Sequence, residues 1–166
     1  LVDRNNNPKD AYYVFKSYWN DTTPFTYIES HTWTERQGPR GLKRQVSVYS
    51  NCPEVELFLN GKSMGLKQRN IKAFPASGLN WDISFVEGEN IIVSRGISKN
   101  GLVVKDSLKV NYRYSKNGKA TSLSLKYKIL ESGNYLITAT ARDNKGLRCL
   151  DYEDRVYFQC LSGGKA

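Results

Sequence analysis

The chain has 166 residues, of which 39% are hydrophobic and 12% aromatic, and this composition argues against an intrinsically disordered protein. The net charge of +9 is spread along the sequence, and no apolar run approaches the roughly 20 residues of a membrane span. The densest basic cluster lies beside glycine and proline, so we interpret it as a solvated loop rather than a nucleic-acid surface: Arg36, Arg40, Lys43 and Arg44. The sequence begins with Leu1 and shows no signal peptide, as expected for a piece of a longer protein.

The first predicted element is an amphipathic helix over residues 8–19. Pro8 suits the first helical turn, with Asn7 as the N-cap. Apolar side chains recur at three- and four-residue spacing: Ala11, Tyr12, Phe15, Tyr18 and Trp19. A helix this short is marginal in water by itself, so its aromatic face must pack on another surface.

Period-two alternation then predicts seven strands and an immunoglobulin-like antiparallel β-sandwich over residues 24–114. The expected strands are 25–33, 43–50, 54–60, 62–68, 79–85, 91–96 and 102–112. Residues 37–42 are expected to be a loop, and Gly88-Glu89-Asn90 a turn. The clearest alternation, at Leu79, Trp81, Ile83 and Phe85, places Trp81 in the core.

Residues 46–65 form the most informative stretch, VSVYSNCPEVELFLNGKSMG. Asn51-Cys52-Pro53 interrupts the alternation, because proline cannot donate to a strand ladder. Asn60-Gly61 suits a type I′ turn, in which both central residues need a positive φ. Leu59 and Lys62 should therefore flank a tight hairpin.

The polar segment 115–119 is the expected domain boundary, and residues 115–166 look like the start of a second β-sandwich that is truncated. The expected strands begin at Leu123 and cover 135–141 and 156–160, so only one layer is present. Its apolar face could fold onto the first sandwich or pair with a second molecule, and we favour a homodimer.

No catalytic, cofactor or metal site is predicted. The three cysteines lack a CxxC pair and metal spacing; Cys149 and Cys160 could bridge, but free thiols are favoured for Cys52, Cys149 and Cys160. The single histidine, His31, is expected to be structural. Four glutamates are not expected to be catalytic: Glu29, Glu35, Glu54 and Glu56.

The motifs resemble a known enzyme family. NPKDAYYVFKSYW (7–19) resembles the last helix of the catalytic barrel in family 2 glycoside hydrolases of the β-galactosidase type. PFTYIESHTW (24–33) with 46–65 is similar to the immunoglobulin-like domain that follows that barrel, and ITATARDNKG (137–146) with 155–163 is similar to a further C-terminal sandwich. The resemblance assigns residues 1–23 to the end of the barrel and its linker.

Such enzymes are retaining glycosidases with two catalytic glutamates on upstream barrel strands, which none of the residues here matches. The resemblance implies a non-catalytic C-terminal accessory region that braces and spaces the barrel, with Tyr12, Phe15 and Trp19 facing it. It also implies a periplasmic or secreted parent, whose remaining chain is the partner. One alternative is a carbohydrate-binding module with Trp33 as the sugar contact. Another is an immunoglobulin-like adhesion domain.

Overall fold

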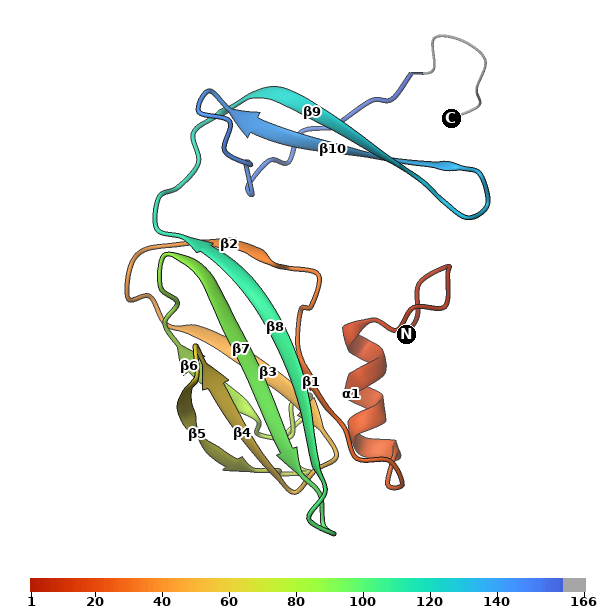
Figure 1. Ribbon diagram of the computed structural model, residues 1–166, viewed down its shortest axis with the longest axis vertical. Coiled ribbons are helices and arrows are strands. Elements are labelled where there is room, and N and C mark those ends of the chain that lie inside the picture. The colour runs from red at the N-terminus through yellow and green to blue at the C-terminus, as the bar shows by residue number, and fades with distance from the viewer. Residues whose placement is uncertain (160–166) are drawn as a thin grey trace. The chain divides into compact units, whose positions relative to one another are not determined.

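The computed structural model describes residues 1–159 and divides into two compact units, Leu1–Ser115 and Lys116–Ala166 (Figure 1). The division falls at the polar segment 115–119. The helix α1 has ten residues, and no helix in residues 1–159 is long and apolar enough to cross a bilayer.

The first unit is a β-sandwich of two sheets, which confirms the predicted all-β fold. The five-stranded sheet has the order β2-β8-β7-β4-β5, and the three-stranded sheet has the order β1-β3-β6. The strands are β1 (Thr26–Ile28), β2 (Glu35–Gln37), β3 (Arg44–Ser50), β4 (Glu54–Leu59), β5 (Lys62–Gln68), β6 (Asn80–Ile83), β7 (Gly88–Ile97) and β8 (Val103–Arg113). All paired strands are antiparallel except β2 and β8, which run parallel.

The core lies between these two sheets and follows the predicted alternation. Trp81 is only 4% exposed, and its indole N–H donates to the Gly65 carbonyl oxygen at 3.0 Å, so its one polar group is satisfied. Leu79, Ile83 and Phe85 are buried in phase with it. The remaining core comes mainly from β3, β4, β7 and β8: Val46, Val48, Val55, Leu57, Ile92, Leu108, Val110 and Tyr112.

The stretch 46–65 folds as predicted. Asn60 and Gly61 have φ values of 50° and 79°, as a type I′ turn requires, and Leu59 pairs with Lys62 across the hairpin. Side chains on β4 alternate between buried and half-buried, with Val55, Leu57 and Leu59 in the core.

Three predictions in this unit were wrong, one for a strand, one for a loop and one for a turn. The expected first strand, 25–33, ends early, because the chain turns after Ile28, and residues 35–37 form a separate strand that pairs with β8. The loop expected at 37–42 starts one residue too early, because Gln37 is the last residue of β2. Gly88-Glu89-Asn90 is the start of β7 instead of a turn, and the fully buried Asn90 side chain donates to the carbonyl oxygens of Val86 and Gly88 at 2.8 and 3.0 Å.

The helix α1 (Asp10–Trp19) begins two residues later than expected. Lys9 is the N-cap and makes no side-chain capping bond, so the assignment of Asn7 was wrong. The Asn7 side chain and backbone instead donate to the carboxylate of Asp3, which holds the preceding turn.

The second unit contains one hairpin, made of β9 (Ala120–Ile129) and β10 (Tyr135–Asp143). One face of this hairpin is apolar along both strands and exposed within the unit, with Leu125 64% and Tyr127 72% exposed. A strand was expected at 156–160. Residues 155–159 form no strand, so the prediction was wrong there, and Cys160 lies outside the described residues. Cys52 is a buried free thiol, as predicted, and Cys149 is buried.

Candidate functional site: the helix–sandwich junction

The helix α1 packs against the sandwich along one side (Figure 1). Val14 and Ser17 are buried there, and Val14 joins a small apolar cluster with Tyr49 of β3 and Ala76. The rings of Tyr13 and Tyr27 stack with their centroids 3.6 Å apart. This second cluster gives the helix the packing surface that a ten-residue helix needs.

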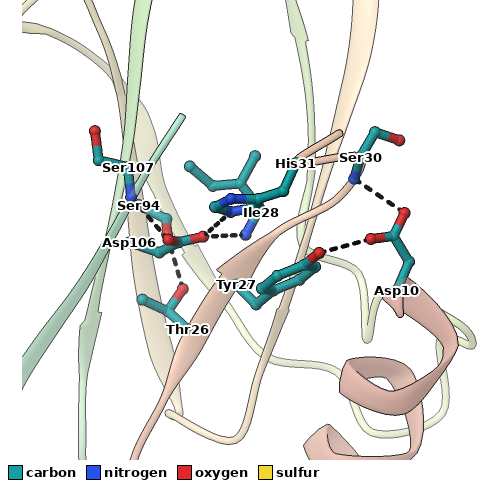
Figure 2. A network of polar contacts seen from close by, with 9 residues as sticks. All are labelled: Asp10, Thr26, Tyr27, Ile28, Ser30, His31, Ser94, Asp106 and Ser107. Carbon is teal, nitrogen blue, oxygen red and sulfur yellow. Dashed lines mark hydrogen bonds and ion pairs between the residues drawn. The ribbon is translucent and has the colours of Figure 1, made fainter. Parts of the chain in front are cut away.

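A polar network fixes the N-terminal end of α1 (Figure 2). The Asp10 carboxylate accepts hydrogen bonds from the Tyr27 hydroxyl at 2.7 Å and the Ser30 backbone N–H at 3.1 Å. A carboxylate in the first helical turn also interacts favourably with the helix dipole. Burial, followed by the bond to Asp10, raises the pKa of Tyr27 far above its usual range, so the phenol stays protonated as a donor.

The same network reaches β8 through Asp106. Its carboxylate accepts from the Ile28 backbone N–H at 2.7 Å and lies 2.7 Å from His31 Nε2 (Figure 2). His31 also stacks on Tyr27, with the centroids 4.7 Å apart. His31 thus links β1 to β8 through these contacts, and residues 1–159 hold no cluster of three or more potential metal-ligating side chains.

Asn51 fixes the other end of the helix. Its amide nitrogen donates to the carbonyl oxygens of Asn20 and Thr23 at 2.8 and 2.9 Å, and its oxygen accepts from the Phe25 backbone N–H at 2.9 Å. Asn51 also lines a polar cavity of about 530 Å³ beside the end of α1. The break in the strand pattern at residue 51 is therefore a clamp on the segment that joins α1 to β1.

A third contact lies between these two ends. The Arg69 guanidinium donates to the Ser17 carbonyl oxygen and lies over the Tyr18 ring, 5.6 Å from its centroid. The Tyr18 hydroxyl donates to the Ala73 carbonyl oxygen at 2.7 Å. The β5–β6 connection thus holds the helix as well, and α1 is fastened to the sandwich along its length.

The opposite side of α1 carries three aromatic rings, of which one is exposed and two are half-buried. Trp19 is 74% exposed, and its ring stacks on Phe15 with the centroids 4.8 Å apart. Tyr12 is half-buried and meets Tyr13 edge-on at 5.2 Å. These are the three residues that the sequence singled out on this helix.

The other sequence candidates lie elsewhere. Trp33 is 61% exposed, with the Arg36 guanidinium 5.2 Å from its ring centroid. Three of the four glutamates have separate partners: Glu29 accepts from Tyr49, Glu35 from Asn111, and Glu56 from Ser63 while pairing with Arg95. Glu54 lies half-buried at the start of β4.

Comparisons with known proteins show which proteins this chain resembles. Residues 41–105 match a family model described as "Domain of unknown function (DUF4982)". A Formosa agariphila protein assigned as a β-glucuronidase is 67% identical over 99% of this chain and 20% of its own length. The chain matches the C-terminal part of family 2-like glycoside hydrolases.

Solved structures of these glycoside hydrolases contain the same fold. A Bacteroides uniformis β-glucuronidase superposes with a TM-score of 0.80 at 40% identity, over 91% of this chain and 19% of that enzyme. A Parabacteroides merdae β-glucuronidase gives 0.79 at 39% identity, over 90% and 19%. The chain spans about a fifth of the length of the relatives it matches. The resemblance to family 2 is confirmed, but β-galactosidase is only an approximate label, because most of these relatives are β-glucuronidases.

Proposed function

We propose that this chain is a non-catalytic accessory region of a glycoside hydrolase, which braces the catalytic barrel of the parent enzyme through the outer face of α1. The barrel-facing residues are Tyr12, Phe15 and Trp19. The observation that carries the proposal is that α1 is held along one side while its other side presents the exposed Trp19 ring, stacked on the half-buried Phe15.

The side of α1 that is fixed to the sandwich supports this function, because a brace has to hold the barrel and the sandwich in a constant relative position. Asp10, Asn51 and Arg69 link the helix to three different parts of the sandwich. The exposed side supports it because Trp is enriched at the energetic centres of protein interfaces. A catalytic role has no support, since no residue of this chain matches the two catalytic glutamates of the family.

The test uses a chimera in which this chain replaces the matching residues of the 67% identical Formosa agariphila relative. We expect Trp19→Ala to lower the melting temperature of the chimera by several degrees, because removing a central interface aromatic costs about 2 kcal/mol or more. The same substitution in the isolated chain should change its stability by less than about 0.5 kcal/mol, because the ring is mostly in solvent there.

Tyr157→Ala is the matched control, since Tyr157 is 84% exposed and lies outside α1. Equal melting temperatures for the Trp19→Ala and Tyr157→Ala chimeras would refute the bracing role. The isolated chain should hydrolyse no aryl glucuronide or aryl galactoside. Turnover that disappeared on replacing one of its own glutamates would refute the non-catalytic assignment.

A further inference from the structure

Trp33 and two arginines of the basic cluster, Arg36 and Arg44, lie in one region of the structure, and the bracing role uses none of them. Trp33 precedes β2, and Arg36 lies within that strand. The Arg36 Nε–H donates to the Trp33 carbonyl oxygen at 3.0 Å. Its guanidinium lies 5.2 Å from the Trp33 ring centroid and 5.7 Å from that of Phe85. Phe85 is buried and Trp33 exposed, so the arginine is held between a core ring and a surface ring.

Arg44 is brought to the same place by the loop between β2 and β3. Its Nη2 donates to the Gln37 carbonyl oxygen at 3.1 Å. A Cβ atom at Gly38 would lie 2.3 Å from the hydroxyl oxygen of the buried Tyr112 and 2.8 Å from Arg44 Nη2, so only glycine leaves room for this arrangement. Burial, and then the charge of Arg44, lower the pKa of Arg36, which shows that the two cations act on each other.

The positive charge of this cluster is not neutralised within residues 1–159. None of the ion pairs there includes Arg36, Arg40, Lys43 or Arg44. Glu29 is the carboxylate that interacts electrostatically with Arg36. Its Oε1 already accepts a hydrogen bond from the Tyr49 hydroxyl at 2.6 Å. Holding two guanidinium groups close together without a carboxylate partner is costly, and an external anion would remove that cost.

We propose that Trp33, Arg36 and Arg44 form a binding site for a pyranose ring that carries an acidic group, either the carboxylate of a uronate or a sulfate ester. The C–H groups on one face of a pyranose suit the electron-rich face of an indole ring. Guanidinium groups match the geometry of carboxylate and sulfate oxygens with paired N–H donors. No residue of α1 belongs to this site, so the binding proposal can be tested independently of the bracing role.

The experiment follows the Trp33 indole N–H of the isotopically labelled chain by NMR, with the resonance assigned from a Trp33→Phe spectrum. The probe is an oligosaccharide of alternating glucuronate and N-acetylglucosamine. The comparison ligands are its carboxyl-reduced neutral form, an O-sulfated version of that neutral form, and poly-glutamate. We expect saturable shifts with the uronate, the sulfated sugar or both, and binding weaker by about tenfold or more for the neutral form, as for loss of a charge-assisted hydrogen bond.

Arg36→Gln and Arg44→Gln should each weaken binding of the acidic sugar, and Trp33→Ala should abolish it. Arg44 is exposed at the start of β3, so its variant tests the site even if Arg36→Gln destabilises the sandwich. Arg95→Gln is the control, because Arg95 is partly exposed on β7 and pairs with Glu56. Equal binding of the neutral sugar would overturn the acidic recognition. Equal shifts with poly-glutamate would show a surface that binds anions in general and would overturn recognition of the sugar. The absence of any shift at the Trp33 indole would show that there is no binding site here.

Discussion

Asn51 makes a sharp prediction about the joint between α1 and β1. Asn51→Ala removes three hydrogen bonds, with lengths of 2.8, 2.9 and 2.9 Å, and leaves two carbonyl oxygens and one N–H without these partners. At about 0.5–1.5 kcal/mol for each bond, the first unit should lose about 2–4 kcal/mol of stability. Asn51→Asp should cost at least as much, because the nearly isosteric carboxylate keeps only the Phe25 contact and faces two carbonyl oxygens with negative charge.

Urea unfolding of the full chain, followed by near-ultraviolet circular dichroism, measures this loss. For an m-value of about 1–1.5 kcal/mol/M, the midpoint of the first unit should fall by about 2 M. Asn134→Asp is the control, since Asn134 is exposed in the β9–β10 turn and the charge change is the same. If Asn51→Asp and Asn134→Asp unfold at the same urea concentration, Asn51 does not clamp the joint.

The remaining predictions concern the core, the junction and the hairpin. Trp81→Ala should destabilise the first unit by about 3–5 kcal/mol, and an unchanged melting temperature would contradict its core position. Burial, followed by bonds to Asp10 and Glu29, raises the pKa values of Tyr27 and Tyr49, so stability should be full below about pH 10 and decline as the pH rises above it. Tyr49→Phe should make this decline shallower in melting curves; an identical pH profile would count against the linkage. The apolar hairpin face should form a homodimer by light scattering that Leu125→Lys disrupts, whereas monomeric wild-type chain would exclude that dimer.

The sandwich could be predicted from sequence because its signals are local. Alternation at 79–85 and the Asn60-Gly61 turn depend on neighbouring residues alone, and both appear as expected. The break after Ile28 has no such signal, since residues 30–34 turn so that β2 can pair in parallel with β8, more than seventy residues away. Parallel pairing leaves no short-range pattern to recognise.

The junction was only half predictable, for a related reason. The aromatic spacing on α1 indicated a packed helix, but it could not say which rings would face the sandwich. The roles of Asp10, Asn51 and Asp106 depend on partners 17 or more residues distant, and each reads locally as an ordinary polar residue. Asn51 gave the only sequence signal of its role, because it interrupts the strand alternation between residues 46 and 59.

The edge strand β5 has a consequence for solubility. It is the outermost strand of the five-stranded sheet, and nearly all of it is exposed. Unpaired backbone groups on such an edge can template the growth of a sheet from molecule to molecule. Lys62 and Lys67 place two positive charges along this strand, and the register shifts within its pairing to β4. Two chains that approached through this edge would bring like charges together on an irregular ladder, which discourages fibrillar self-association.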